Sequence, residues 1–518
     1  MEKQLLLGDE ALALGAINAG LSGVYSYPGT PSTEVTEYIQ LHKPEVRSRW
    51  CTNEKTAMEA ALGMSYAGKR ALVCMKHVGM NVCADAFINS ALTGVNGGLV
   101  VFAADDPSMH SSQNEQDSRF YGKFAMVPVF EPSTQQEAYD MIGRAFDFSE
   151  EVKLPVLFRM VTRLSHSRAA VQPGEVREQN PFNPSDDRGW ILLPAISRRK
   201  YVALIEKQEV LRQASEQAAV VEGCGKMGVI ACGNVYNYVK EMDPDAFILK
   251  INQYPLPIGK IKEFASHCES VLVVEDGQPV AEEEIRGILG PGYTVKGRLS
   301  GELPRTGELN PDSVAIALGV TPAEGFPAAE NLVGRPPQLC VGCGHRDVYT
   351  ALGEVVKEYP SARVFGDIGC YTLGALPPFK ALNSAVDMGA SITMAKGAAD
   401  AGVFPAISVI GDSTFAHSGM TGLLDAVNDH SNITVIISDN LTTGMTGGQD
   451  SAATSKFEQI CLALGVEQEH LHVVNPIAVN IESIKEILRR EIEYKGVSVI
   501  IPRRECMQTL RRHSKNKK

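Results

Sequence analysis

The sequence predicts an α/β protein made of three doubly wound domains with mainly parallel sheets. Three observations support this class. Runs of β-branched residues alternate with helix-forming segments through about the first 185 residues, as in a doubly wound unit. The same alternation returns after residue 200 and again in the last third of the chain. Polar or Pro- and Gly-rich stretches at residues 172–188 and 323–337 separate these parts. We therefore expect domains at residues 1–185, 190–325 and 330–518.

Strands and helices can be placed within the first two domains from these patterns. The first domain is expected to have strands at residues 23–27, 70–75, 99–104 and 155–160. The second is expected to begin with a charged helix at 200–219, followed by strands at 227–232, 246–251 and 270–275.

The third domain contains the segments with the clearest chemistry. Two β-branched runs end in polar turns, at residues 409–413 and 435–442, and residues 419–429 between them read as a crossover helix. Parallel strands joined in this way bring their carboxyl ends together, so Asp412 and Asn440 should lie near one point. A carboxylate and an amide oxygen suit Mg²⁺, which takes few protein ligands and keeps water and phosphate oxygens. An ordinary βαβ unit with two polar turns would show the same pattern.

Composition excludes several functional classes. The chain has 518 residues and enough apolar side chains for several cores. A net charge of −12 argues against a nucleic-acid-binding protein. No apolar run reaches the length of a membrane span, and the first ten residues do not form a secretory signal. Eleven cysteines do not suggest a disulfide framework. We expect a cytoplasmic protein whose basic end, residues 503–518, is a solvated terminus.

The third-domain pattern resembles the Gly-Asp-Gly…Asn signature of thiamine diphosphate enzymes, with Ser413 in place of the third glycine. Most of the chain resembles the 2-oxoacid:ferredoxin oxidoreductases, and within them the alpha subunits of indolepyruvate:ferredoxin oxidoreductases. The segments that carry this resemblance are 24–34, 52–63, 76–81, 114–119, 340–346 and 366–371. The resemblance implies two thiamine diphosphate-binding halves and, between them, a domain like the C-terminal domain of transketolase.

The resemblance also implies roles for particular residues in holding the cofactor. The backbone carbonyl of Thr442 would join Asp412 and Asn440 as ligands of Mg²⁺. The remaining positions expected to contact thiamine diphosphate are Gly411, Ser413, Gly444, Cys340, Gly342 and Cys343.

Glu54 would hydrogen-bond the aminopyrimidine ring and favour its reactive tautomer. From the residues alone, it could equally be an acid in the first turn of a helix capped by Thr52. Family members place a hydroxyl beside the substrate at the position of Thr30, whose neighbours Ser32 and Thr33 are candidate helix caps. His345 is the expected catalytic histidine, and His77 and His417 are further pocket candidates. An isolated histidine is, however, more often structural.

Two features concern the substrate and the metals. Relatives acting on pyruvate have a bulky aliphatic residue at the position of Gly29, so we hypothesise that Gly29 leaves room for an aryl side chain. Cys340 and Cys343 form a Cys-x₂-Cys pair, but zinc would need about four ligands and Cys370 stands alone in the sequence. The resemblance places this pair against the thiamine pocket.

The Cys-x₂-Cys-x₂-Cys-x₃-Cys-Pro run that marks ferredoxin-like domains does not occur in these 518 residues. We therefore expect no [4Fe–4S] cluster on this chain. A smaller beta subunit would supply the clusters and pass electrons to ferredoxin. The expected reaction converts an aryl pyruvate and CoA to an aryl-acyl-CoA, in a homodimer or heterotetramer. The alternatives are a non-oxidative thiamine-dependent decarboxylase or carboligase, and a non-catalytic assembly subunit.

Overall fold

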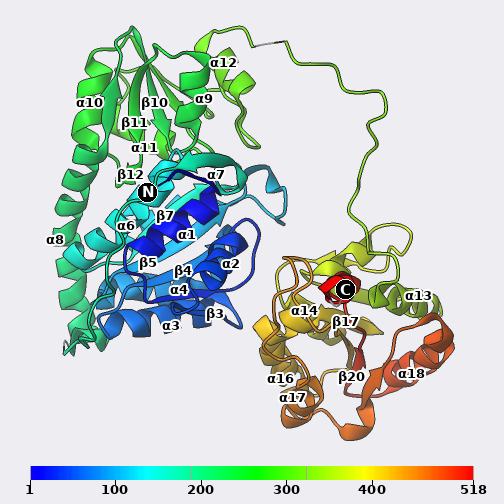
Figure 1. Cartoon of the computed structure of the whole chain (residues 1–518). Coiled ribbons are helices and arrows are strands. Elements are labelled where there is room, and N and C mark those ends of the chain that lie inside the picture. Colours follow the sequence, from blue (N-terminus) through cyan, green and yellow to red (C-terminus); the bar gives the residue numbers. More distant parts are fainter. Residues whose placement is uncertain (1, 187, 323, 517–518) are drawn as a thin grey trace. The chain divides into compact units, whose positions relative to one another are not determined.

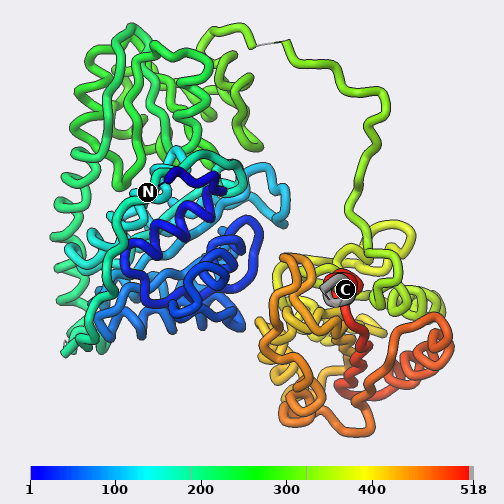
Figure 2. The backbone as a smooth tube through the Cα atoms, viewed as in Figure 1, coloured from blue at the N-terminus to red at the C-terminus, as the bar shows by residue number. Residues whose placement is uncertain are grey.

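The computed structural model describes residues 2–186, 188–322 and 324–516. The chain divides into two compact units, Met1–Pro327 and Ala328–Lys518. Residues 324–343 join them without forming a helix or strand, and Figure 2 shows this segment as a long open run of chain. The predicted linker begins at Ala323, which lies outside the described residues. The predicted boundary between the first two domains falls inside the first unit, so the three-domain division stays a prediction.

The first unit contains a seven-stranded sheet whose central strands are parallel and buried, as predicted (Figure 1). Its order is β12 (Gln253–Tyr254), β6 (Val129–Phe130), β7 (Val156–Val161), β5 (Leu99–Asp105), β4 (Ala71–Lys76), β2 (Gly23–Ser26) and β3 (Arg47–Trp50). The two faces are covered by helices α1 (Gly8–Asn18), α2 (Thr33–His42), α3 (Glu54–Tyr66), α4 (His77–Thr93) and α6 (Gln135–Val152). Short helices α5 (Arg119–Ala125) and α7 (Thr162–His166) follow strand ends.

One pairing in this unit was not predicted. Strand β1 (Gln4–Leu7) pairs antiparallel with β8 (Arg168–Val171) in a separate two-stranded sheet. The N-terminal strand is therefore paired with the strand that comes just before the polar segment at residues 172–188. This pairing holds the N-terminus of α1 next to the end of α7. The described part of that segment forms no regular element before a short 3₁₀ turn at Arg188–Trp190.

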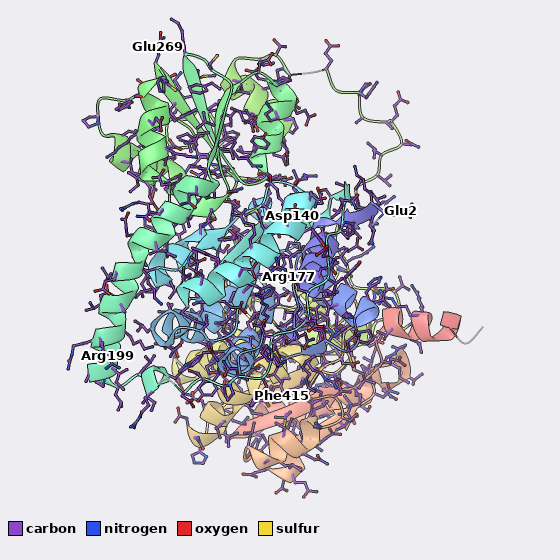
Figure 3. The ribbon with its side chains drawn as sticks, turned by 60° about the vertical axis from the view of Figure 1, so that its left-hand side comes forward. Glu2, Asp140, Arg177, Arg199, Glu269 and Phe415 are labelled. Atoms are coloured by element: carbon purple, nitrogen blue, oxygen red, sulfur yellow. The ribbon has the colours of Figure 1, made fainter. Side chains whose placement is uncertain are left out.

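A second, five-stranded sheet completes the first unit. Its order is β14 (Val295–Lys296), β13 (Ser270–Val274), β10 (Met227–Cys232), β11 (Phe247–Ile251) and β9 (Val220–Glu222), and only β9 is antiparallel to its neighbour. Its helices are α8 (Pro194–Ala218), α9 (Val235–Met242), α10 (Ile258–Ser266), α11 (Val280–Leu289) and α12 (Pro311–Leu318). Helix α8 begins earlier than predicted, because Pro194 is tolerated at the first helical position. Figure 3 shows Arg199 near the start of this long helix and Glu269 just before β13.

The two sheets of the first unit are locked together. Strand β12 follows β11 in the chain but pairs with β6 of the first sheet. Buried ion pairs reinforce the connection: Arg119 contacts Asp117 at 2.6 Å and Glu275 at 2.8 Å. Asp276 lies 3.3 Å from Arg298 within the same network. Charges this deeply buried persist because each is paired and hydrogen-bonded.

The second unit contains a six-stranded sheet in which every pairing is parallel. Its order is β16 (Ser384–Ala385), β15 (Arg363–Gly366), β17 (Ala406–Gly411), β18 (Ile433–Ser438), β20 (Val497–Pro502) and β19 (Leu471–Val474). Alternate residues of β17 face opposite sides: Ile410 packs toward helices α14 (Ala390–Asp400) and α16 (Met420–Asn428), and Val409 toward α13 (Gly344–Val356) and α18 (Ile481–Glu493). The predicted α/β class with mainly parallel sheets is confirmed.

One local prediction for this unit is confirmed and extended, and another was wrong in part. The crossover helix predicted at residues 419–429 is present as α16 (Met420–Asn428), but it continues a helical stretch that begins earlier. Helix starts directly at Asp412, with α15 (Asp412–Thr414), a π-helical turn (Phe415–Gly419) and α16 in succession. The basic terminus is not a free tail, since Arg503 pairs with Asp439 at 2.6 Å and with Glu458 at 2.8 Å. Helix α19 (Met507–Asn516) follows.

Among the described residues, no helix is both long enough and apolar enough to cross a bilayer. The cytoplasmic location stays a prediction.

Candidate functional site

The predicted magnesium ligands come together at the carboxyl edge of the second unit's sheet. Asp412 directly follows β17, and Asn440 lies two residues after β18. The amide of Thr442 donates to Asp412 Oδ2 at 3.1 Å and to Asn440 Oδ1 at 3.2 Å. The two side-chain oxygens therefore converge on one point, as expected from strands with Gly411 opposite Ser438 in parallel register. We call these three residues the diphosphate clamp.

The electrostatics of the clamp favour a cation. Asp412 is buried, and burial raises the pKa of its carboxyl to about 7, with a further contribution from the nearby Asp439 carboxylate. Hydrogen bonds from the amides of Ser413 and Thr442 act in the opposite direction. A divalent ion at this point would remove the cost of burying the negative charge, so the donor set fits Mg²⁺.

Glycines beside the clamp are required for close packing. A Cβ on Gly411 would lie 2.4 Å from the ring of Tyr371, which is too close for any side chain. Ser413, which stands where the resemblance expects a third glycine, donates or accepts a hydrogen bond with Thr443 at 2.9 Å. The substitution therefore ties the clamp to the next loop.

A cavity of about 90 Å³ adjoins the clamp and holds four cysteines. Its lining includes Asn440 and Gly444 together with Cys340, Cys343, Cys370 and Cys506. A Cβ on Gly444 would lie 3.5 Å from Cys370 Sγ and 3.8 Å from Cys506 Sγ, so these two sulfurs flank the same small space. We call this group the four-cysteine cavity.

The thiols of this cavity affect one another. The pKa of Cys370 is raised to about 12, first by burial and then by Cys506, Cys343 and Cys340 in that order. The pKa of Cys343 is also raised, mainly by burial. Gln508 donates to Cys340 Sγ at 3.4 Å, so the terminal segment helps to close the cavity. Cys370 therefore does not stand alone in space, since it lines one cavity with the three other cysteines.

Sequence reasoning missed this cluster because it searched for one compact cysteine motif. The four thiols come from the turn before α13, the 3₁₀ segment after β15 and the segment after β20. A usable signal was present: Cys370 and Cys506 each follow a buried strand, at the same sheet edge as the clamp.

His345 lines the same cavity from the first turn of α13. Its ring is buried, packs edge-on to Tyr371, and its Nε2 atom has no hydrogen-bond partner in the structure. Burial lowers the pKa of His345 to about 4, so the ring is neutral near pH 7. A buried polar atom without a protein partner, in a residue that lines a cavity, is what a ligand-contacting histidine would present. Gly342, also predicted here, adopts a φ of +81° in the turn between the two cysteines of the pair.

Glu54 is the first residue of α3 in the other unit, where it is buried. The cap of this helix is Asn53, not the predicted Thr52, since its side chain accepts from the Thr56 amide at 2.9 Å. Glu54 also lies against the start of α4: a Cβ on Gly79 would sit 2.7 Å from Glu54 Oε1. Gly79 therefore leaves the space that the Glu54 carboxylate occupies.

Thr30 lies in the turn between β2 and α2, and Ser32 is the residue that precedes the helix. The space beside Gly29 is not open. A Cβ there would lie 3.1 Å from Cγ and 3.2 Å from Cδ of Lys76, whose Nζ donates to the Ser111 carbonyl at 2.7 Å. The Gly29 hypothesis must therefore include Lys76, which has to move before a larger group can enter.

The two other histidine candidates are held by protein groups. His77 Nδ1 accepts from the Asp106 amide at 3.2 Å and Nε2 donates to the Asn114 carbonyl at 3.1 Å, which supports a structural role. His417 is buried and its Nδ1 lies 2.5 Å from Ser418 Oγ. The structure thus groups the clamp, the four-cysteine cavity and His345 in one unit, and Glu54, Thr30 and Gly29 in the other.

The sequence matches known proteins along nearly its full length. Residues 14–214 match the family described as pyruvate flavodoxin/ferredoxin oxidoreductase, thiamine diphosphate-binding. Residues 367–501 match the thiamine pyrophosphate enzyme, C-terminal TPP-binding domain. Both predicted cofactor-binding halves are thereby located, and the second match contains the clamp.

Curated relatives cover both regions together. The chain is 40% identical to "Indolepyruvate oxidoreductase subunit IorA" of Archaeoglobus fulgidus, over 98% of this chain and 86% of the relative. It is 37% identical to the protein of the same name from Pyrococcus horikoshii, again over 98% and 86%. Among solved structures, it is similar to a 2-oxoglutarate:ferredoxin oxidoreductase from Magnetococcus marinus, with a TM-score of 0.52 and 17% identity over 61% of this chain and 65% of that one. That likeness concerns the fold.

Proposed function

Because this chain belongs to the indolepyruvate oxidoreductase IorA family of thiamine diphosphate-dependent oxidoreductases, we propose that the diphosphate clamp and the four-cysteine cavity form its catalytic centre. The observation that carries this proposal is their shared location at one sheet edge. Asn440 belongs to both: its side-chain oxygen faces the clamp, and the residue also lines the cavity.

The clamp is proposed to hold Mg²⁺ and, through it, the cofactor diphosphate. Asp412 and Asn440 supply side-chain oxygens, and the Thr442 backbone carbonyl is the third ligand that the family resemblance implies. When bound, thiamine diphosphate supplies a carbon nucleophile and an electron sink for decarboxylation of a 2-oxo acid. Gly411 allows the backbone near the clamp to pack closely, Gly444 lies between the clamp and the four-cysteine cavity, and Ser413 fixes the neighbouring loop.

Protein side chains have distinct proposed tasks around the reaction. Glu54 hydrogen-bonds the pyrimidine ring, because it is a buried acid at a position that matches the family's activating glutamate. His345, neutral and with a free Nε2 atom, contacts the reacting end of the substrate or cofactor from α13. Thr30 positions the substrate.

The four-cysteine cavity is proposed to hold a [4Fe–4S] cluster. Four thiolates are the ligand set of such a cluster, and the raised thiol pKa values are those of unliganded cysteines in a buried site. Bound iron would remove the free-energy cost of keeping ionised thiols in a buried site, because it coordinates the thiolates directly. A cluster supplies one-electron transfer when bound. This proposal replaces the expectation that clusters reside only on a partner subunit.

The proposed reaction is CoA-dependent oxidative decarboxylation of indolepyruvate or a related aryl pyruvate, with ferredoxin as acceptor and a smaller beta subunit as partner. A non-oxidative decarboxylase transfers no electrons, so it would not need a cluster in the four-cysteine cavity. A non-catalytic assembly subunit would not need converging Asp412 and Asn440 side chains. Both alternatives are outcomes of the following test.

The test uses the full chain, purified without oxygen together with its native partner. We expect Mg²⁺-dependent binding of thiamine diphosphate by calorimetry, about four irons per chain, and CoA-dependent reduction of a viologen dye with indolepyruvate. Asp412→Ala should abolish cofactor binding, whereas Asp450→Ala in the next loop should retain it. Aldehyde release without dye reduction would favour the decarboxylase, and absence of cofactor binding by the wild type would favour the assembly subunit.

A further inference from the structure

Three ionisable side chains meet in the first unit at a place with no role in the proposed reaction. Asp9, Glu34 and His166 each offer one ligand atom, and these atoms all lie within 4.8 Å of one another. His166 Nε2 is 3.4 Å from Glu34 Oε1. The three residues come from the starts of α1 and α2 and the end of α7. We call them the Asp9–Glu34–His166 cluster.

The fold brings these elements together through a backbone contact. Strand β1 pairs with β8, which places the start of α1 against α7. A Cβ on Gly8 would lie 2.2 Å from the carbonyl oxygen of Leu164, so only glycine permits this approach. Asp9 follows Gly8 directly, and its carboxylate is thereby set beside the last turn of α7.

The cluster contains buried carboxylate oxygens that the protein satisfies poorly. Asp9 is fully buried, and neither of its carboxylate oxygens has a hydrogen-bond partner at normal distance and angle, although the nearby Ser165 hydroxyl acts to lower the pKa of Asp9. Glu34 Oε2 is likewise buried and unpartnered. Native proteins rarely leave such atoms without a donor or a cation, because the cost is several kcal/mol for a charged group.

Two arrangements would satisfy these oxygens. In one, Asp9 is protonated and shares its proton with Glu34. In the other, a cation binds both carboxylates. Burial raises the pKa of Asp9 well above its usual range, and the charge of Glu34 raises it further. The pKa of His166 is raised by Glu34, its hydrogen-bonded neighbour. The pair with His166 lowers the pKa of Glu34 in turn. The short spacing of the three ligand atoms is the geometry that a divalent cation would use.

We propose that the Asp9–Glu34–His166 cluster binds a first-row divalent transition-metal ion, zinc being the preferred occupant. An imidazole with two carboxylates suits Zn²⁺, Mn²⁺ or Fe²⁺ better than Mg²⁺ or Ca²⁺, which favour oxygen ligands alone. Zn²⁺ binds such nitrogen and oxygen sites more tightly than Mn²⁺ or Fe²⁺. Three protein ligands leave a coordination position for water.

A cavity adjoins the cluster at His166. Half-exposed His166 also lines a cavity of about 250 Å³, together with His110, Thr162, Arg163, Ser167 and Glu308. Glu308 in this cavity is already paired, with Arg163 at 2.5 Å and His110 at 3.1 Å. Hydrated ions can therefore reach His166 from this cavity.

Binding would fix the start of α2. Glu34 is the second residue of that helix and lies four residues after Thr30. A metal bond between α1, α2 and α7 would therefore hold the turn that carries Thr30 against the rest of the unit. The metal proposal itself is independent of any catalytic role of Thr30.

The test measures metal content of the full chain after chelation and controlled reloading. With Zn²⁺, we expect Asp9→Asn and His166→Gln each to bind one equivalent less than the wild type. His110→Gln is the matched control, since His110 lines the same cavity outside the cluster, and it should bind as the wild type does. Equal stoichiometry in wild type and Asp9→Asn would overturn the proposal.

Cobalt distinguishes this site from the four-cysteine cavity. Co²⁺ bound by cysteines shows thiolate charge-transfer absorption, whereas a site of nitrogen and oxygen ligands shows only weak d–d bands. We expect Asp9→Asn to lose d–d intensity and to keep any thiolate band. Loss of the thiolate band alone would overturn the assignment.

Zn²⁺ should also raise the melting temperature of the wild type but not of Asp9→Asn. A metal-independent rise in Asp9→Asn would support the shared proton and reject the metal site.

Discussion

The amide of Cys506 donates a hydrogen bond to the backbone carbonyl of Asn440 at 3.0 Å. This contact joins the final cysteine of the four-cysteine cavity to the loop that carries a clamp ligand. The segments after β18 and β20 are paired further back as well, since the Arg504 amide donates to the Asp439 carbonyl at 3.0 Å. A substitution in the four-cysteine cavity should therefore alter the loop that carries the diphosphate clamp, and a substitution in the clamp should alter the cavity.

Serine at Cys370 or Cys506 should lower the iron content to near zero and abolish viologen reduction, because a cluster needs all four thiolates. Thiamine diphosphate binding should weaken less than tenfold in these variants, since Asp412 and Asn440 are intact. Iron analysis and calorimetry measure the two effects separately. Cys224→Ser is the control, because Cys224 is exposed in the first unit. Unchanged iron in Cys370→Ser would refute the cluster.

Alanine at Gly79 should impair catalysis through Glu54. The new Cβ would lie 2.7 Å from Glu54 Oε1, so the carboxylate must move from its position. We expect kcat to fall at least a hundredfold, in line with loss of a proton-transfer group, and Glu54→Gln to behave in the same way.

The matched control for this prediction is Gly63→Ala on α3. A Cβ there meets no atom within 4 Å. It should leave kcat unchanged and stabilise the helix by about 0.5–1 kcal/mol. A normal kcat in both Gly79→Ala and Glu54→Gln would remove Glu54 from the mechanism.

Isoleucine at Gly29 should raise KM for aryl pyruvates about tenfold or more, because it fills the space beside Lys76 and displaces that side chain. The double variant Gly29→Ile/Lys76→Ala separates two causes. A return of KM to the wild-type value would show that the isoleucine acts by displacing Lys76. A KM that stays high would show that the aryl group itself occupies the space beside Gly29. Steady-state kinetics with phenylpyruvate and indolepyruvate measure both. Turnover unchanged in the single variant would reject the Gly29 hypothesis.

Asp276 should make the first unit's stability depend on pH. Burial raises the pKa of its carboxyl from 3.8 to about 6, and Oδ2 has no hydrogen-bond partner. A raised carboxyl pKa contributes stability that is fully present below pH 3.8 and is lost as pH rises through 6. From pH 4 to pH 7, the unfolding free energy of the wild type should therefore fall by about 2.4 kcal/mol relative to that of Asp276→Asn.

Calorimetric unfolding of both proteins across that pH range measures this shift. Glu269→Gln is a suitable control, since Glu269 is an exposed surface residue. A difference that does not change with pH would show that Asp276 ionises normally in the folded protein.

Local pattern was sufficient to predict the α/β class, central strands of each large sheet and the convergence of Asp412 with Asn440. Strand periodicity and turn residues are properties of neighbouring residues, and parallel strands place their carboxyl ends together in any sheet of this kind. Some detail was missed: a helical stretch from Asp412 precedes the predicted crossover helix, and Asn53 rather than Thr52 caps α3. Helix ends depend on a few competing hydrogen bonds that pattern alone does not rank.

Tertiary structure alone decided the rest. The sequence shows Cys340 and Cys343 at Cys-x₂-Cys spacing. That Cys370 and Cys506 line the same cavity depends on the order of β15, β17, β18 and β20 in the sheet. Asp9, Glu34 and His166 come together only because Gly8 lets α1 touch the backbone of α7. Contacts between residues far apart in the chain are set by packing and strand order, which no local period encodes.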